Sequence, residues 1–275
     1  MPADPHPLLV LGGTDAVGRF LIERALARGP VTVVGRSAPH DARAQWRQWD
    51  LATQPVADQG LRADAAVATL PIWWLAAHLP GLAKAGVKRL VAFSSTSVEV
   101  KRESRSRHAQ AIVTALAEGE AAVTQGCAAL GIGLTLLRPT LIYGLGLDRN
   151  VSAAARFILR FGFFPVAWNA EGKRQPVHAE DLAVAALTAL ERQQAVGKIY
   201  AVPGGETLAY RAMIARIFGA LGRRPLIIRV PALAFVSDMA RRMARDQAFD
   251  IGPAARDLDY APRRFLAGGR SDLGV

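Results

Sequence analysis

The sequence predicts an α/β protein built on a doubly wound parallel sheet, with a smaller lobe toward its C-terminus. Three observations predict this class: short apolar runs alternate with helical stretches over the first 140 residues or so, a glycine-rich turn follows the first run, and the pattern loosens beyond Arg138. Strand–helix alternation with short connections is typical of a parallel sheet covered by helices on both faces. The length of 275 residues suits one such core with an added lobe.

The elements follow in a regular order. Apolar spacing predicts a helix over 17–28, which Gly29 and Pro30 end. Strands are expected at 8–11, 31–34, within 46–51, and at 65–70, 89–93 and 132–137, and further core helices at 73–85 and 109–130. In the remaining chain, helices are expected near 152–161, 179–192, 209–221 and 231–247, and short strands near 198–202 and 226–230.

Charge and composition exclude several classes of protein. The net charge of +11 is almost all arginine and is spread over both halves, with one dense run at 101–108. No nucleic-acid-binding motif accompanies it, so we expect a solvated basic surface and no specific nucleic-acid partner. The single cysteine, Cys127, excludes a disulfide framework, and no His, Asp or Glu cluster has metal-ligand spacing, so no metal is expected.

No apolar run reaches the roughly 20 residues of a membrane span. The N-terminal residues 1–7 are polar and rich in proline, which does not match a signal peptide. We therefore expect a cytoplasmic protein.

The turn between the first strand and the first helix reads Gly12-Gly13-Thr14-Asp15-Ala16-Val17-Gly18. A glycine turn here lets backbone N–H groups approach a pyrophosphate at the start of a helix. Read as G-x-x-G-x-x-G, the motif has Asp15 in place of its middle glycine; read as G-x-x-x-G-x-G, it has Ala16 there. The turn predicts a Rossmann-type site in which Gly12 and residues 14–18 contact a dinucleotide, with a plain strand–helix turn as the alternative.

Two positions bear on the choice of dinucleotide. Arg36 follows the second strand, where NAD-preferring sites usually place an acid. A guanidinium suits the 2′-phosphate of NADP, so we predict NADP ahead of NAD, with a surface arginine as the alternative. Asp50 and Leu51 follow the third strand and are expected to meet the adenine, unless Asp50 is a turn residue. We assign residues 1–150 to a dinucleotide-binding core, and 151–275 to a smaller mixed substrate lobe with segments returning to the core.

Several segments carry a family resemblance by their order and spacing. They are 12–18, Asp50-Leu51, 91–97 (VAFSSTS), 137–144 (LRPTLIYG), 175–183 (QPVHAEDLA), 204–207 (GGET) and 258–263 (LDYAPR). Together they resemble the NAD-dependent epimerase/dehydratase family, the extended branch of the short-chain dehydrogenase/reductase superfamily, along nearly the whole chain.

The resemblance implies roles for individual residues. Thr96 matches a hydroxyl that hydrogen-bonds a substrate carbonyl or alcohol, and His178, a candidate substrate residue, matches the segment that returns from the substrate lobe. Tyr143 is a candidate proton donor, with a half-buried structural tyrosine as the alternative. The cofactor is expected to contact Thr69, Leu70, Pro71, Ser94, Pro139 and Thr140 as well as the glycine turn.

The Tyr-x-x-x-Lys pair that supplies the general acid/base in such enzymes is missing. None of the four tyrosines has a lysine four residues later. Aligning Glu120 with the family's acidic residue puts Ile112 and Leu116 at the Tyr and Lys positions. Neither side chain transfers a proton, and a positioned acid/base contributes about 10²–10⁴-fold in rate.

Three functions stay open from the sequence. The first is an NADP-dependent oxidoreductase on a small substrate, for which the basic lobe (Arg156, Arg160 and Arg174) favours an anion. The second is a non-catalytic NAD(P)-binding redox sensor, assembly factor or scaffold. The third, a nucleic-acid or anionic-surface binder, rests on charge alone. Polar groups beside the nicotinamide position would favour the enzyme, and an apolar wall would favour the second function. The Ala-rich run 109–130 is a candidate homodimer surface, with a monomer also open.

Overall fold

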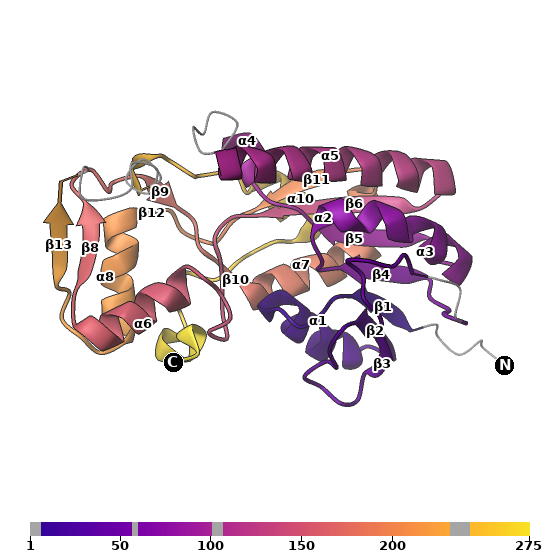
Figure 1. The fold of residues 1–275 in the computed structure, drawn as a ribbon, viewed down its shortest axis with the longest axis horizontal. Helices are drawn as coiled ribbons and strands as arrows, with labels where there is room; N and C mark the ends of the chain where they lie inside the picture. Colours follow the sequence, from indigo (N-terminus) through magenta and orange to yellow (C-terminus); the bar gives the residue numbers. More distant parts are fainter. Residues whose placement is uncertain (1–6, 57–59, 101–106, 232–242) are drawn as a thin grey trace.

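The computed structural model describes residues 7–56, 60–100, 107–231 and 243–275. Its centre is a sheet of seven parallel strands in the order β11-β6-β5-β4-β1-β2-β3 (Figure 1). The strands are β1 (Leu8–Leu11), β2 (Val31–Gly35), β3 (Gln45–Gln48), β4 (Ala65–Ala68), β5 (Arg89–Phe93), β6 (Gly133–Pro139) and β11 (Ile199–Val202). The predicted Rossmann-type doubly wound sheet is thus confirmed.

Helices cover both faces of this sheet because the side chains of each buried strand alternate between faces. Val10 joins a core with α1 (Ala16–Leu26) and α7 (Ala179–Glu191), whereas its neighbours Leu9 and Leu11 join a core on the opposite face. That second core is formed with α2 (Ile72–Leu75), η1 (Ala76–His78), α3 (Leu79–Ala85) and α5 (Arg107–Leu130). The short helices α4 (Ser97–Val100), η2 (Gln193–Ala195) and α10 (Gly252–Leu258) complete the core region.

A smaller lobe stands at the left of Figure 1, with its own apolar core. It contains α6 (Val151–Phe161), β8 (Phe164–Ala167), α8 (Tyr210–Ala220), β13 (Ile227–Val230) and η4 (Gly269–Leu273). Three two-stranded sheets lie in this part: β8 with β13, β7 (Ile142–Tyr143) with β10 (Val177–His178), and β9 (Lys173–Arg174) with β12 (Leu208–Ala209). From the same half of the sequence, β11, α7 and α10 pack on the main sheet.

The structure differs from the expected elements in two places. The helix predicted over 73–85 is divided into α2, η1 and α3, because Pro80 has no N–H to continue a helix and fits only a first turn. Residues 232–242 of the helix predicted over 231–247 lie outside the described residues, and of the described part only 243–244 are helical. Within the residues that are described, no helix combines the length and apolarity needed to cross a bilayer.

Candidate functional site

A cavity of about 390 Å³ lies at the carboxyl ends of the parallel strands, next to β1 and β4. These two strands are neighbours, but the chain continues from β1 toward one edge of the sheet and from β4 toward the other. This topological switch point is where open α/β sheets bind ligands, and the volume is within the range of small-molecule sites. We call it the switch-point cavity. It is lined by Asp15, Ala16, Val17, Thr69, Leu70, Pro71, Ile72, Trp73, Phe93, Ser94, Leu116, Pro139, Ile142, Leu147 and Asp148.

The glycine turn beside the cavity is shaped by close backbone approaches. Gly12 and Gly13 have φ angles of 101° and 100°, a region that glycine adopts without strain. A Cβ on Gly18 would lie 2.3 Å from the Cα of Gly13, so α1 crosses the turn at a distance only glycine allows. The N–H of Gly13 donates to Thr69 Oγ1 at 3.0 Å, which ties the turn to the end of β4.

Asp15 occupies the start of α1. It is the N-cap residue, and its Oδ1 accepts the N–H of Gly18 at 2.9 Å. The carboxylate therefore uses an amide at the helix N-terminus, where the positive end of the helix dipole would otherwise attract a pyrophosphate. The Asp15 carboxylate thus lies at the N-terminus of α1, the place where Rossmann-type sites bind a pyrophosphate.

The lining of the cavity is mainly apolar. Among the lining residues that the structure describes, the polar side chains are Thr69, Ser94 and two carboxylates, Asp15 and Asp148, and none is a cation. Asp148 is bound at the start of α6, where it accepts the backbone N–H groups of Asn150 (2.9 Å) and Ser152 (3.1 Å).

Ser94 has the one buried side-chain polar atom without a hydrogen-bond partner among the described residues. Its backbone N–H donates to Leu137 O at 2.8 Å, which fixes the residue at the end of β5, while its Oγ has no acceptor or donor nearby. An orphaned buried hydroxyl costs free energy unless a ligand or water satisfies it. Because Ser94 lines the cavity, this hydroxyl fits a polar group of a bound ligand.

Leu116 of α5 also lines the cavity and is buried. The resemblance described above places the family's lysine at this position, an alignment that remains a prediction. Ile112, one turn earlier at the tyrosine position, packs against the adjoining core. The part of the cavity wall that α5 supplies is therefore the apolar side chain of Leu116.

Thr96 and Thr140 use their hydroxyl protons inside the chain. Thr96 is buried, and its Oγ1 donates to Pro139 O at 3.1 Å. Thr140 Oγ1 donates to the carbonyl of Gln175. Both contacts fasten the loop after β6, and neither hydroxyl lines the cavity.

Tyr143 and His178 lie in the protein interior. Tyr143 is fully buried, its hydroxyl accepts the N–H of Leu266 at 3.1 Å, and burial raises its pKa. His178 caps α7 by accepting the Glu180 N–H at 3.3 Å, and burial lowers its pKa. The rings of the two residues contact each other edge to face, 5.2 Å apart. We therefore do not propose Tyr143 as the proton donor or His178 as a substrate ligand.

The loop at the ends of β2 and β3 carries the residues expected at the adenosine end. Arg36 is largely exposed, with its Nε 4.0 Å from Asp50 Oδ1. Asp50 Oδ1 also accepts the N–H of Ala52 at 3.1 Å, which is a turn contact. Leu51 is buried, so it is a packing residue.

His78 holds this loop, and sequence reasoning did not single it out. Its ring is buried, with Nδ1 accepting the N–H of Val56 and Nε2 facing Leu51 O, both at 3.0 Å. Burial lowers its pKa, which fits a neutral ring that donates at one nitrogen and accepts at the other. A lone histidine between apolar residues gives no local signal of such a role.

Of the residues predicted to hold a cofactor, eight line the cavity: Asp15, Ala16, Val17, Thr69, Leu70, Pro71, Ser94 and Pro139. The other predicted site residues stand outside its lining, namely Gly12, Thr14, Gly18, Arg36, Asp50, Leu51, Thr96, Thr140, Tyr143 and His178. The lining also includes Trp73, Leu116, Leu147 and Asp148, which were not predicted as ligand contacts. No group of three His, Cys, Asp or Glu side chains suited to a metal was found in the part of the chain that is described.

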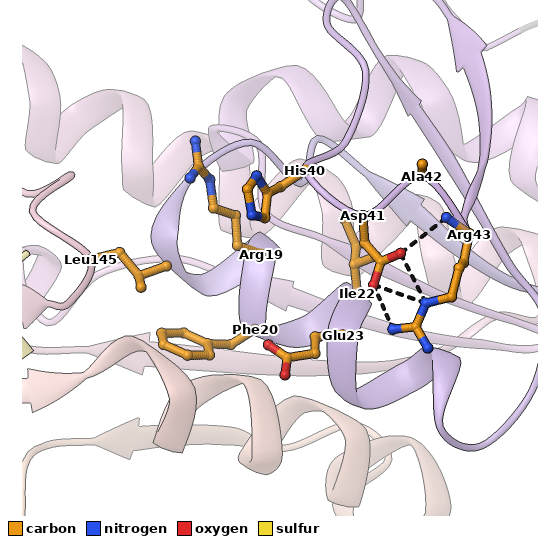
Figure 2. Close-up of a pocket in the computed structure, with 9 residues that line it drawn as sticks. All are labelled: Arg19, Phe20, Ile22, Glu23, His40, Asp41, Ala42, Arg43 and Leu145. Atoms are coloured by element: carbon orange, nitrogen blue, oxygen red, sulfur yellow. Dashed lines mark hydrogen bonds and ion pairs between the residues drawn. The ribbon is translucent and has the colours of Figure 1, made fainter. Parts of the chain in front are cut away.

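A second cavity of about 510 Å³ lies on the outer side of α1 (Figure 2). It is lined by Arg19, Phe20, Ile22, Glu23, His40, Asp41, Ala42, Arg43 and Leu145. Its charges compensate one another: Arg43 Nη2 lies 2.6 Å from Asp41 Oδ2, and this pairing lowers the pKa of Asp41 to about 2. We assign no function to this cavity.

No protein-family model and no curated protein matches the chain. Solved structures do match along nearly its whole length. MoeE5 in complex with UDP-glucose and NAD has a TM-score of 0.80 at 17% identity, covering 98% of this chain and 97% of its own. The UDP-glucuronic acid 4-epimerase of Bacillus cereus in complex with NAD has 0.77 at 15%, covering 97% and 96%.

The UDP-N-acetylglucosamine 4-epimerase of Methanobrevibacter ruminantium M1, in complex with UDP-N-acetylmuramic acid, has 0.80 at 12%, covering 98% and 97%. At these identities the likeness establishes the fold and not the chemistry. The chain therefore has the Rossmann-like fold of NAD-dependent UDP-sugar epimerases.

Proposed function

We propose that this protein is an atypical member of the epimerase/dehydratase type that binds a nicotinamide dinucleotide in the switch-point cavity without catalysing Tyr–Lys proton transfer. It serves as a redox-responsive binding protein, an assembly factor or a scaffold. The observation that carries this proposal is the cavity wall: buried Leu116 of α5 lies in it, at the position that the resemblance to the family aligns with a lysine, and the described lining residues include no cation and no tyrosine.

Three features support dinucleotide binding. The cavity lies at the switch point of the sheet, the glycine turn borders it, and Ser94 Oγ is left without an internal partner. Proteins of the same fold have been solved with NAD. Against these stands the Asp15 carboxylate, so we expect binding to be weaker than a glycine at that position would allow.

The preference for NADP rests on Arg36. Its side chain is exposed at the end of β2 and held only loosely near Asp50, so it is available to a phosphate. A charge-assisted hydrogen bond contributes about 1.5–3 kcal/mol. We therefore expect Arg36→Ala to weaken NADP⁺ binding by roughly tenfold or more and to leave NAD⁺ binding unchanged.

Isothermal titration calorimetry of the purified protein with NADP⁺ and with NAD⁺ tests both the binding of a dinucleotide and the preference for NADP. Arg47→Ala is the matched control, because Arg47 is an exposed arginine on the neighbouring strand β3. Binding of neither dinucleotide would overturn the proposed function. Equal affinities for the two, with no effect of Arg36→Ala, would overturn the NADP preference alone.

The second candidate is an oxidoreductase on a small substrate, favoured by the free hydroxyl of Ser94 inside the cavity. A bound dinucleotide would supply hydride transfer, and Ser94 is the side chain placed to hold a substrate hydroxyl or carbonyl. The assay follows the nicotinamide absorbance after a UDP-sugar is added to the protein and dinucleotide. A change in absorbance that is lost in Ser94→Ala but kept in Ser95→Ala would establish this function. Binding without turnover in any of these proteins supports the non-catalytic proposal.

A further inference from the structure

The outer edge of the lobe exposes several large apolar side chains. Trp168 is 68% exposed and Leu226 is 56% exposed, and Phe161 and Ile228 are also exposed. Single exposed apolar residues are ordinary, but a contiguous group marks a contact surface.

Strand pairing places the two segments that carry these residues side by side, although the segments are far apart in sequence. The backbone N–H of Phe164 donates to Leu226 O at 2.9 Å, and that of Trp168 donates to Val230 O at 3.0 Å. Between these bonds Ile228 pairs with Pro165. The edge formed by β8 and β13 is about 13 Å long at about 3.3 Å per residue, and it stands at the extreme left of Figure 1.

Aromatic stacking extends this edge onto the end of α6. The ring centroid of Phe157 lies 4.6 Å from that of Phe161 and 5.5 Å from that of Phe164. Phe161 in turn lies 6.4 Å from Phe163. The apolar surface therefore continues from the strand pair to the C-terminal turn of the helix.

Arginines flank the apolar residues, and the acidic residues are missing. Segments 157–168 and 223–231 hold Arg160, Arg223, Arg224 and Arg229 and contain no Asp or Glu. Two of these guanidinium groups lie over exposed aromatic rings: Arg160 over Phe161 at 5.3 Å and Arg229 over Trp168 at 5.8 Å. We call the exposed residues of these two segments the lobe edge.

We propose that the lobe edge docks on an anionic lipid bilayer. Tryptophan and phenylalanine are suited to the interface between headgroups and acyl chains, and arginines reach phosphates while their stems cover apolar surface. A second copy of this chain fits poorly, because it would place four arginines against four arginines. A nucleic acid would use the rings for stacking but would give Leu226 and Ile228 no apolar partner.

Vesicle flotation of the full chain tests this proposal. The vesicles are phosphatidylcholine alone, or phosphatidylcholine with a third of phosphatidylglycerol. We expect binding to the anionic vesicles only, decreasing with salt. Arg224→Ala should weaken it by about fivefold, the loss expected for one basic residue near an anionic surface. Trp168→Ala should weaken it by about tenfold, equivalent to losing roughly 60 Å² of buried apolar area at 25 cal/mol per Å².

Arg47→Ala is the control, because it removes the same charge from β3, at the opposite end of the ribbon (Figure 1). Thermal unfolding of each variant confirms that it is folded. Equal weakening by Arg47→Ala and Arg224→Ala would overturn the proposal, since it would show attraction by net charge alone. Absence of flotation with anionic vesicles, or binding to single-stranded DNA that is lost in Trp168→Ala, would also overturn it.

Discussion

Replacing Asp15 by asparagine should strengthen dinucleotide binding while leaving the fold intact. Asp15 Oδ1 accepts the Gly18 N–H at 2.9 Å, and an anion bound by the amides at this helix end would take a similar hydrogen-bond distance. The carboxylate and a pyrophosphate would then stand within about 5 Å of each other. One pair of like charges at that separation costs about 0.8–3.3 kcal/mol for a dielectric constant between 80 and 20.

Removing the charge should therefore lower the dissociation constant by about fourfold to two-hundredfold. Asparagine caps a helix about as well as aspartate, so the free energy of unfolding should change only by the lost charge–dipole interaction, about 0.3–1 kcal/mol. Alanine removes both the charge and the cap. Asp15→Ala should therefore show the same gain in affinity together with a loss of about 1 kcal/mol in stability.

Isothermal titration with NADP⁺ gives the affinities, and urea denaturation gives the stabilities. Glu23→Gln is the matched control, because Glu23 is an exposed carboxylate of the same helix that faces the second cavity (Figure 2). The reasoning is refuted if Asp15→Asn binds no more tightly than the wild type. It is also refuted if Glu23→Gln gains as much affinity, since the effect would then be one of net charge.

Three further predictions concern stability and are measured by urea denaturation. Gly18→Ala should cost about 1–3 kcal/mol or more, because its Cβ would lie 2.3 Å from backbone, whereas Gly29→Ala meets nothing within 4 Å and should cost little. Glu120→Ala should cost about 3 kcal/mol by leaving Arg138 half-paired in a buried site, with exposed Glu118→Ala as the control. Burial lowers the pKa of His78, so the unfolded chain takes up a proton at a higher pH than the folded protein does. The free energy of unfolding should therefore fall as the pH drops below about 6.5. His78→Gln should reduce this dependence of stability on pH, and an unchanged dependence would contradict the assignment of His78 as a neutral buried ring.

The layers of the fold were predictable because short, local runs of apolar residues indicate the strands that build them. Runs such as 8–11 and 89–93 are apolar enough to be buried on both faces, and a parallel sheet is the architecture that buries them. The glycine turn then marks the switch point, since its position after the first strand fixes where the sheet divides.

The roles of single site residues were less predictable because they depend on distant partners. Tyr143 is fully buried, and its hydroxyl accepts the N–H of Leu266, 123 residues away. Thr96 is bound to Pro139, and His78 bridges Leu51 and Val56. None of these contacts leaves a periodicity or a motif in the sequence, and all three are made by polar atoms whose partners only the tertiary fold supplies.

The glycines of the turn, which predict a cofactor site, also have a purely structural role. A glycine variant therefore cannot test pyrophosphate binding, whereas an Asp15 variant can. Gly18 is required because α1 packs against Gly13, and a Cβ on Gly12 would lie 2.7 Å from Thr69 Oγ1. Both constraints hold whether or not a dinucleotide binds. The loss of stability expected for Gly18→Ala would therefore say nothing about function. Asp15 differs, because asparagine also caps the helix, so the variant stays folded and its affinity reports on a bound anion. A gain in affinity at Asp15 is thus the observation that would separate a functioning pyrophosphate site from a turn that only retains its shape.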